Sequence, residues 1–185
     1  MCYHQLIMVT EKEILSLSQE IGVLLRQRGW YLVTAESCTG GLLGNWITDI
    51  PGSSDYYLGG VVAYANRVKQ TLLNVPETVL TQSGAVSEEV ACAMATGVRH
   101  LFADQMALER LVGVGVTGIA GPGGGTPEKP VGLVWIAVET PATRRVERFL
   151  WQGDRLQNKA LSAHKALSML REELLSEEEF FHGKR

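Results

Sequence analysis

The sequence has few of the features that mark membrane, secreted or nucleic-acid-binding proteins. No apolar run approaches the roughly 20 residues that span a bilayer, and the N-terminus lacks the cationic start of a signal peptide. The three cysteines, Cys2, Cys38 and Cys92, form no CxxC pair, so the sequence indicates neither a disulfide framework nor a zinc site. The 17 basic and 20 acidic residues give a formal net charge of −3, which disfavours binding to nucleic-acid phosphates. We therefore expect a cytoplasmic protein that binds neither membranes nor nucleic acid.

The pattern of apolar residues predicts one α/β domain over residues 1–185, because the length fits a single domain and no linker or repeat interrupts it. Strands are predicted at residues 30–35, 56–65, 111–117, 131–139 and 145–151. Helices are predicted at residues 11–28, 42–50, 66–73, 87–101 and 154–175. Strands that alternate with helices and end in a hairpin are typical of a three-layer α/β/α sandwich with a mixed, mostly parallel β-sheet.

Capping residues mark the starts of several of these helices. Thr10 followed by Glu13 has the form of a capping box, in which each of the two side chains accepts a hydrogen bond from the backbone N–H group of the other residue. Asn66 and Ser87 are placed to cap the third and fourth helices. We expect the core to cover residues 11–175, with flexible termini on either side.

A small polar segment, ESCTGG at residues 36–41, joins the first strand to the second helix. There Ser37 can expose its hydroxyl at the carboxyl end of the sheet, where open α/β folds bind ligands. The N–H groups that open the helix can then hold an oxyanion. Alternatively, Ser37 or Thr39 simply caps that helix. A nucleophilic serine also needs a base, yet the sequence has no GxSxG motif and its histidines lie in no motif context.

The remaining candidate base is Lys69, if burial depresses its pKa. It follows the predicted strand end AYAN by three residues, where Tyr64 and Asn66 alternate to the same side. A serine–lysine pair assisted by a tyrosine is chemically reasonable. Spacing alone leaves open the alternatives of a solvated helix lysine and a core tyrosine.

Residues 116–132, VTGIAGPGGGTPEKPVG, are too rich in glycine and proline to form a helix. Such a loop exposes backbone N–H groups that can bind an anion such as phosphate, or it is a mobile surface turn. Arg155, in the sequence GDR before the last helix, can reach toward this loop and pair with a phosphate. The alternative for Arg155 is an ordinary arginine in the first helical turn.

The glycines Gly113, Gly115 and Gly118 spell GxGxxG, and Glu139 follows about 20 residues later, as in a dinucleotide-binding fingerprint. The first two glycines lie inside a valine-rich strand, and prolines follow where the fingerprint needs a helix. We therefore reject this interpretation. A Walker A motif is absent as well, because no GK[ST] occurs.

Four segments of the sequence carry a resemblance to a known family. They are AESCTGG at 35–41, PGSSDYYLGGVVAYAN at 51–66 followed by Lys69, GAVSEEVA at 84–91, and TGIAGPGGGTPEKPVG at 117–132. In this order they resemble the CinA C-terminal domain family, whose members include nicotinamide-nucleotide amidase. The resemblance covers residues 11–175 as a stand-alone domain. It does not include the N-terminal nucleotide-hydrolysing domain of full-length CinA proteins, whose activity is not expected here.

The resemblance implies an amidohydrolase that converts nicotinamide mononucleotide to nicotinate mononucleotide and ammonia, with no metal and no cofactor. It implies Ser37 as the nucleophile, Lys69 as its base, and Tyr64 as a proton-relay or orienting partner. We expect the Lys69 amine to lie within hydrogen-bond distance of the Ser37 hydroxyl or to reach it through one water. The implied substrate-binding residues are Thr39, Gly40, Asn66, Thr117, Gly118, Gly121, Gly123, Gly124 and Arg155. One departure is Ala65, which replaces the serine of the common family sequence AYSN and removes a hydroxyl near the site.

A second hypothesis is a non-catalytic nucleotide-binding or regulatory module of the competence and damage-inducible type, which keeps the pocket without turnover. The presence of Ser37, Tyr64 and Lys69 together favours the enzyme, because a pure binder needs no nucleophile with a base. The expected partner is a small pyridine nucleotide. We also expect a homo-oligomer, with a dimer favoured.

Overall fold

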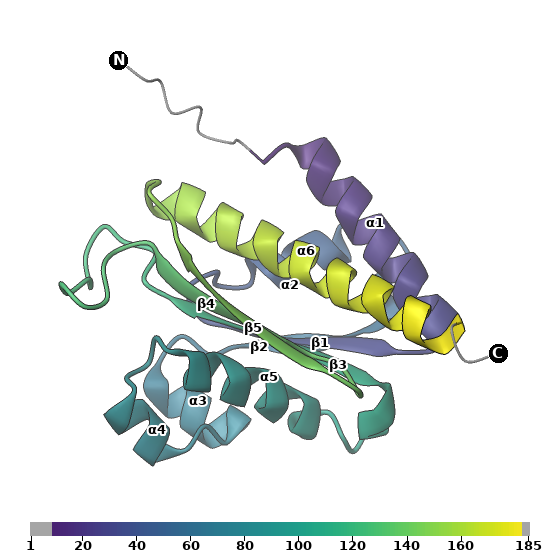
Figure 1. Cartoon of the computed structure of the whole chain (residues 1–185), viewed down its shortest axis with the longest axis horizontal. Helices are drawn as coiled ribbons and strands as arrows, with labels where there is room; N and C mark the ends of the chain where they lie inside the picture. The colour runs from purple at the N-terminus through teal and green to yellow at the C-terminus, as the bar shows by residue number, and fades with distance from the viewer. Residues whose placement is uncertain (1–8, 183–185) are drawn as a thin grey trace.

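The computed structural model describes residues 9–182, which form a β-sheet between two layers of helices (Figure 1). The strands are β1 (Tyr31–Glu36), β2 (Tyr57–Val62), β3 (Leu111–Gly118), β4 (Leu133–Glu139) and β5 (Arg144–Leu150). The helices are α1 (Glu11–Arg28), α2 (Leu42–Thr48), α3 (Asn66–Leu73), α4 (Glu77–Gln82), α5 (Glu88–Leu101) and α6 (Arg155–His182). The layer on one face holds α1, α2 and α6, and the layer on the other holds α3, α4 and α5. The predicted three-layer α/β/α sandwich is therefore confirmed.

The strands follow the order β2-β1-β3-β4-β5, so the predicted mixed sheet is also confirmed. β1 pairs in parallel with β2 and β3, whereas β4 pairs antiparallel with both β3 and β5. Four strands thus run in one direction and β4 alone runs in the other. The register pairs Glu36, the last residue of β1, with Val62 of β2 and Val116 of β3. The segments that follow these three strands consequently leave the sheet at the same end, where open α/β sheets bind ligands.

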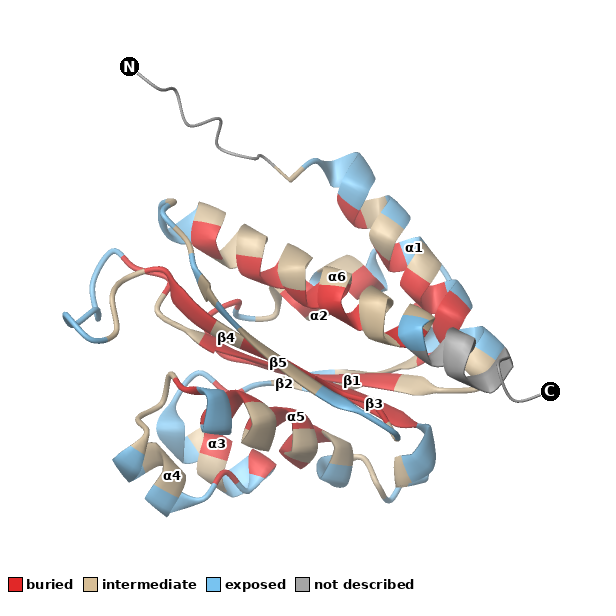
Figure 2. Ribbon diagram, in the orientation of Figure 1, coloured by how far each residue is buried: buried red, intermediate tan, exposed pale blue. Residues whose placement is uncertain are grey.

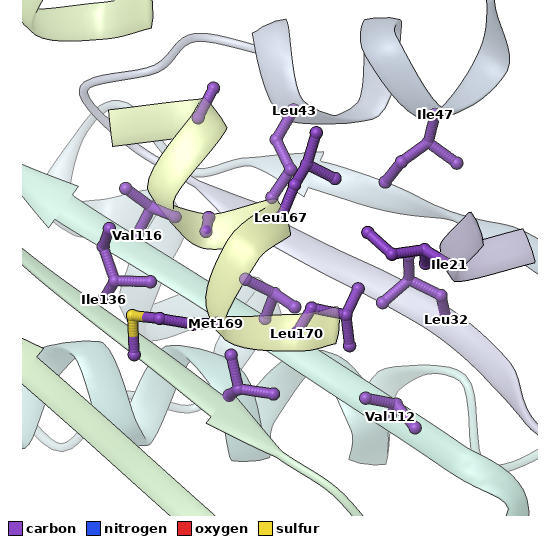
Figure 3. Close-up of a cluster of buried hydrophobic side chains, with 14 of the residues drawn as sticks. Ile21, Leu32, Leu43, Ile47, Val112, Val116, Ile136, Leu167, Met169 and Leu170 are labelled. Carbon is purple, nitrogen blue, oxygen red and sulfur yellow. The ribbon is translucent and has the colours of Figure 1, made fainter. Parts of the chain in front are cut away.

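Alternate strand residues supply two hydrophobic cores, one on each face of the sheet (Figure 2). The larger core lies beneath α1, α2 and α6, where Val112 and Ile136 of the sheet belong to the same cluster as Leu167 of α6 (Figure 3). The smaller core includes Val33 of β1 and Met94 of α5. Burying apolar surface on both faces holds the strand ends in a fixed relation to the helices that start there.

Two glycines inside β3 allow α5 to pack directly on the sheet. An added Cβ at Gly113 would lie 2.4 Å from the Ala95 carbonyl oxygen, and one at Gly115 would lie 2.3 Å from the Ala91 carbonyl oxygen. Any side chain at these two positions would push the helix away from the strand. The GxGxxG spelling is therefore a feature of helix packing within β3, in agreement with its rejection as a dinucleotide fingerprint.

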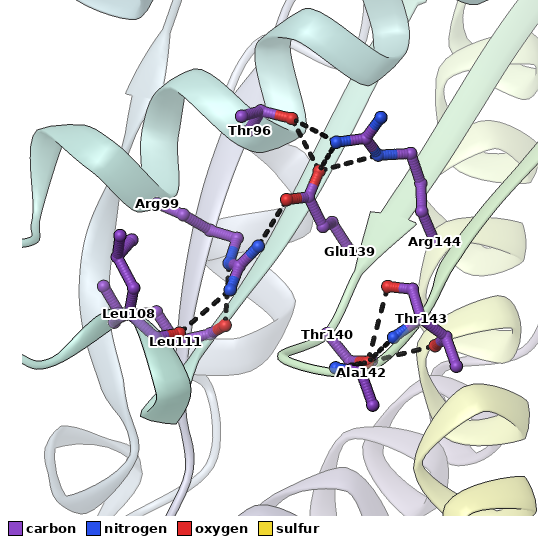
Figure 4. Close-up of polar contacts among 9 residues, drawn as sticks. All are labelled: Thr96, Arg99, Leu108, Leu111, Glu139, Thr140, Ala142, Thr143 and Arg144. Carbon is purple, nitrogen blue, oxygen red and sulfur yellow. Dashed lines mark hydrogen bonds and ion pairs between the residues drawn. The ribbon is translucent and has the colours of Figure 1, made fainter.

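Glu139, the last residue of β4, joins the sheet to α5 through an ionic network (Figure 4). Its carboxylate accepts hydrogen bonds from Arg99, from Thr96 at 2.6 Å and from Arg144 Nε at 2.8 Å. Burial by itself raises the pKa of the Glu139 carboxyl group. The hydrogen bonds from Thr96 and Arg144 and the charges of the two arginines outweigh burial, so the pKa is lowered.

The helix caps test the sequence predictions at single residues. The capping box of Thr10 and Glu13 is confirmed, and so is the Ser87 cap of α5. The predicted Asn66 cap is wrong, because Ala65 is the N-cap of α3 and Asn66 is already its first helical residue. The backbone of Ala65 is extended, and its carbonyl oxygen accepts the first hydrogen bonds of the helix. Its side chain makes no capping hydrogen bond.

Two helices differ from the sequence predictions. The short helix α4 was not predicted, because it buries none of its residues and so has no apolar period to detect. The last helix, α6, continues to His182, past the predicted end of the core at residue 175, because the added segment is rich in helix-forming glutamates. The predicted flexibility of the termini also concerns residues 1–8 and 183–185, which lie outside the described residues.

Replacing Glu139 with Gln is expected to destabilise the fold by about 3 kcal/mol at pH 7, because Arg99 loses its counter-ion. The Arg99 side chain is only 11% exposed. A carboxyl group whose pKa is lowered by folding adds stability above its unfolded pKa, and this stability is lost as the pH falls through the folded pKa. The difference in the free energy of unfolding between wild type and variant should therefore become smaller as the pH falls below 4.5, the ordinary pKa of a glutamate. Urea denaturation at pH 7 and pH 3 measures the difference in the free energy of unfolding, and Glu147→Gln, at a more exposed carboxylate, is the control. An equal difference at both pH values would contradict the lowered pKa of Glu139.

Replacing Ala65 with Ser is expected to stabilise the protein by about 1 kcal/mol, because the new hydroxyl can accept a free N–H group in the first turn of α3. A matched control is Ala93→Ser within α5, where a serine has no cap to form and no gain is expected. Thermal or urea denaturation of the two variants gives the comparison. Equal changes in the stability of the two variants would show that a side-chain cap at the start of α3 gives no stabilisation.

Candidate active site

The described residues form a cavity of about 260 Å³ at the end of the sheet where β1, β2 and β3 finish. Its walls come from the segments after those three strands, from the turn before α5 and from the start of α6. The lining residues are Ser37, Cys38, Tyr64, Asn66, Lys69, Ala85, Val86, Thr117, Gly118, Ile119, Ala120, Gly121, Gly123, Gly124 and Arg155. The fold therefore gathers most of the predicted site residues around one space.

Ser37 and Lys69 form a buried pair in this cavity. Ser37 follows β1 directly, and Lys69 lies in the first turn of α3, which follows β2. Lys69 Nζ is 3.0 Å from Ser37 Oγ and 2.9 Å from the carbonyl oxygen of Ala63. The expectation that the amine lies within hydrogen-bond distance of the hydroxyl is therefore confirmed.

The surroundings of Lys69 favour a neutral amine. Only 1% of the residue is exposed, and among the described residues its hydrogen-bond partners are a hydroxyl and a carbonyl, with no carboxylate in an ion pair. Burial lowers the pKa of Lys69, and a weaker opposite contribution comes from the Cys38 thiol. A neutral amine can accept the proton of the Ser37 hydroxyl, whereas an ammonium group can only donate.

Cys38 is next to Ser37 and also lines the cavity. Burial raises the pKa of its thiol to about 12. The thiol therefore stays protonated at neutral pH, and the reactive form of cysteine is the thiolate. Of the two adjacent side chains, Ser37 is the one that has a base within reach.

The carboxylate of Glu36 occupies the N–H groups that were expected to hold an oxyanion. It accepts hydrogen bonds from the N–H groups of Gly41 at 2.9 Å, Leu43 at 3.1 Å and Gly44 at 2.8 Å, all at the start of α2. These donors are already satisfied by a buried anion, so they are not available to a substrate. The expectation that the start of α2 forms the oxyanion site is therefore wrong.

Other backbone N–H groups around the cavity are available. Within residues 9–182, the cavity residues whose N–H groups donate to no backbone or side-chain oxygen include a set of five near Ser37 and in the loop after β3: Cys38, Ala120, Gly121, Gly123 and Gly124. Four of them belong to the glycine-rich loop between β3 and β4. The prediction that this loop exposes N–H groups to an anion agrees with this geometry.

Arg155, the first residue of α6, joins the glycine-rich loop to Tyr64. Its Nη1 donates to the carbonyl oxygen of Gly121 at 2.6 Å, and its Nη2 donates to the Tyr64 hydroxyl at 2.7 Å. The predicted reach of Arg155 to the loop is thus confirmed. Tyr64 is 60% exposed, and no hydrogen bond joins it to Ser37 or Lys69 among the described residues. This geometry supports an orienting role for Tyr64 and gives no contact for a direct proton relay.

Two predicted substrate-binding residues, Thr39 and Gly40, do not line the cavity. Thr39 is fully buried, and Gly40 has a φ angle of 65°, which turns the chain between Ser37 and α2. Their position in this turn means that they shape the segment that presents Ser37. Ala65 is also outside the lining, so its departure from the common family sequence concerns the α3 cap.

One wall of the cavity was not assigned from the sequence. Ala85 and Val86 line it from the turn before α5, and the Thr117 hydroxyl donates to the Ala85 carbonyl oxygen at 2.7 Å. Ile119 and Ala120 add further apolar lining from the loop after β3. The signal that could have found this wall is the segment GAVSEEVA, which is one of the four segments of the resemblance.

Other site classes find less support in the described part of the chain. Neither His100 nor His164 lines the cavity. Among the residues whose side chains the structure describes, 9–176, no three or more His, Cys, Asp or Glu gather into a group that could hold a metal ion. The helices of the same range include none with the length and apolar character that crossing a bilayer requires.

Comparison with known proteins identifies relatives of the whole domain. A "CinA-like protein" of Desulfotalea psychrophila is 49% identical over 162 residues, which are 88% of this chain and 38% of that protein. A "CinA-like protein" of Salinibacter ruber is 49% identical over 159 residues, 86% of this chain and 37% of that protein. The chain thus spans little more than a third of the length of these curated relatives.

Solved structures and a family model match nearly the same region. The competence/damage inducible protein CihA of Agrobacterium tumefaciens is 36% identical, with a TM-score of 0.79 over 89% of this chain and 97% of that chain. A CinA superfamily protein of Klebsiella pneumoniae is 31% identical, with a TM-score of 0.80 over 88% of this chain and 98% of that chain. The model described as "CinA C-terminal domain" matches residues 14–174. The chain therefore belongs to the CinA C-terminal domain family.

Proposed function

We propose that this chain is an amidohydrolase that converts nicotinamide mononucleotide and water to nicotinate mononucleotide and ammonia. The observation that carries the proposal is the buried pair of Ser37 and Lys69, whose Oγ and Nζ atoms lie 3.0 Å apart at a cavity. A lysine buried without a carboxylate is a suitable base, and the serine beside it is a suitable nucleophile. The choice of amide substrate rests on the family resemblance, and the chemistry of the site supports it.

In the first half of the proposed reaction, neutral Lys69 takes the proton of the Ser37 hydroxyl while Oγ attacks the carboxamide carbon. The Ala63 carbonyl, which accepts a hydrogen bond from Nζ at 2.9 Å, holds the amine in position. Collapse of the tetrahedral intermediate breaks the C–N bond, and the leaving nitrogen receives the proton from Lys69. Ammonia leaves, and the acyl group remains as an ester on Ser37.

In the second half, Lys69 takes a proton from a water molecule that attacks the ester carbon. The ester bond breaks, Ser37 Oγ regains a proton from Lys69, and the carboxylic acid is released. The sum is one amide and one water converted to one acid and one ammonia. Candidate donors to the negative oxygen of both intermediates are the unoccupied N–H groups of Cys38 and of the glycine-rich loop.

The remainder of the cavity has the chemistry for a nucleotide phosphate and ribose. Arg155 uses two of its five N–H donors on Gly121 and Tyr64, which leaves three for an anion. The N–H groups of Gly123 and Gly124 are a second set of donors in the same lining. Asn66, Thr117 and Gly118 are proposed as further contacts to the polar groups of the substrate.

Replacing Ser37 with Ala is expected to lower the release of ammonia from nicotinamide mononucleotide by at least about 10³-fold, because the acyl-enzyme cannot form. The cavity should still bind the nucleotide, since the change removes one oxygen atom. Coupled ammonia detection and isothermal titration calorimetry measure the two effects. The control is Ser54→Ala, at an exposed serine outside the cavity.

The same pair of measurements separates the enzyme from the non-catalytic module. Turnover in the wild type that disappears in Ser37→Ala eliminates the pure binder. Saturable nucleotide binding in the wild type without any ammonia release would eliminate the enzyme and leave the regulatory module.

The protonation state of Lys69 is expected to control kcat/KM. Because burial lowers its pKa from the ordinary value of 10.5, kcat/KM should rise with pH as the ammonium group loses its proton and level off above the lowered pKa. Lys69→Arg keeps a donor but stays protonated at every pH, so it should lose at least about 10²-fold in kcat/KM without recovery at high pH. Lys12→Arg, at an exposed lysine of α1, is the matched control. A pH-independent wild-type rate would refute the role of Lys69 as base.

A further inference from the structure

A second lysine, Lys129, makes contacts that the proposed reaction does not use. It lies near the end of the glycine-rich loop that projects from the sheet between β3 and β4 (Figure 1). Its Nζ donates to the carbonyl oxygen of Ser83 and to that of Val86 at 2.7 Å. No ion pair joins it to a carboxylate within the described residues, so its ammonium group is held by two backbone carbonyls.

The ammonium group fits a turn that is shaped to receive it. Ser83 and Val86 are three residues apart, and Gly84 between them has a φ angle of 71°. A Cβ added to Gly84 would lie 2.9 Å from Lys129 Nζ, so a side chain there would meet the lysine. The turn therefore presents two carbonyl oxygens and a bare backbone to one compact cation, which is the geometry of a lysine head rather than of a planar guanidinium.

This turn is a wall of the cavity. Ala85 and Val86 line the cavity, and the Ala85 carbonyl oxygen is held by the Thr117 hydroxyl from the end of β3. The carbonyl groups of residues 83, 85 and 86 are thus all bound by side chains from the β3 strand or from the loop that follows it. The packing of α5 on β3 fixes only the end of the turn, and because residues 83–86 are half-buried, these side-chain bonds supply their direct attachment to β3 and to the loop.

The opposite wall is held by α6. Arg155 donates to the Gly121 carbonyl oxygen and Asn158 donates to that of Ala120 at 3.1 Å. The glycine-rich loop is therefore attached to α6 near its start and, through Lys129, to the turn before α5 near its end. The hydrogen bonds of Lys129 therefore connect the glycine-rich loop to the wall formed by the turn before α5.

We propose that Lys129 is a positioning residue that fastens the glycine-rich loop, residues 119–131, to the turn at residues 83–86 and so sets the spacing of the walls that bind the substrate. Lys129 does not line the cavity, so it takes no part in the chemical step. The inference rests on the proposed function for its kinetic consequence. The attachment of the loop can be measured independently of any activity.

The test compares Lys129→Met and Lys129→Arg with Lys12→Met, which removes an exposed lysine charge from α1. Methionine keeps an apolar stem without donors, and arginine keeps the charge with a head that the space over Gly84 does not fit. Both Lys129 variants should raise KM for nicotinamide mononucleotide by about tenfold or more, since misplaced walls weaken binding. kcat should fall by a smaller factor than KM rises, because Ser37, Lys69 and the Cys38 N–H group stay in place and only the oxyanion donors of the loop are displaced.

Hydrogen exchange provides the second readout. In both Lys129 variants, amides of residues 83–87 and 119–131 should exchange faster, while those of β1 and β3 keep their wild-type rates. Unchanged exchange in the two segments would overturn the proposal, and so would faster exchange with an unchanged KM. If the wild type released no ammonia, the proposed function would fail, and exchange in the two segments would alone decide whether Lys129 fastens the loop.

Discussion

The rest of this site depends on the burial of the Lys69 amine away from water and from carboxylates. Transfer of an ammonium ion into a protein interior costs several kcal/mol, and the amine responds with a lowered pKa. The buried amine still needs hydrogen-bond partners, and the Ser37 hydroxyl and the Ala63 carbonyl oxygen supply them for Lys69. The parallel pairing of β1 and β2 is what brings these atoms together, because both strands end at the same level.

Glu36 is the residue before Ser37, and its carboxylate is buried next to the turn that presents the serine. A carboxylate within about 4–6 Å of Lys69 would favour the charged amine. The fold binds this carboxylate instead to three N–H groups at the start of α2. The left-handed backbone of Gly40 and Gly41, with φ angles of 65° and 95°, makes the turn that brings those N–H groups back to it. The two glycines of ESCTGG therefore give the Glu36 carboxylate three backbone partners at the start of α2, and no ion pair joins it to Lys69 within the described residues.

The sequence was sufficient for the layer architecture, because alternating strand and helix periods determine it, whereas Ser37 and Lys69 were named as a pair by the family resemblance and not by their spacing. It was insufficient for the role of Glu36, because a cap is normally the residue just before its helix, and this cap acts across a five-residue turn. The wall at residues 83–86 depends on tertiary bonds from Thr117 and Lys129, which no local pattern encodes. The cytoplasmic location, the single domain and the homo-oligomer stay predictions.

The direction of one strand explains why so many segments meet at this cavity. Because β4 runs against β3, the chain must turn back at the end of the sheet where β1 and β2 also finish, and that return is the glycine-rich loop. β5 reverses again, so its carboxyl end reaches the same level and α6 begins there, with the Trp151 N–H donating to the Gly132 carbonyl at 2.9 Å. A fully parallel arrangement would have sent the chain after β3 across a helix to the far end of the sheet. The antiparallel hairpin instead delivers both the loop and Arg155 to the serine.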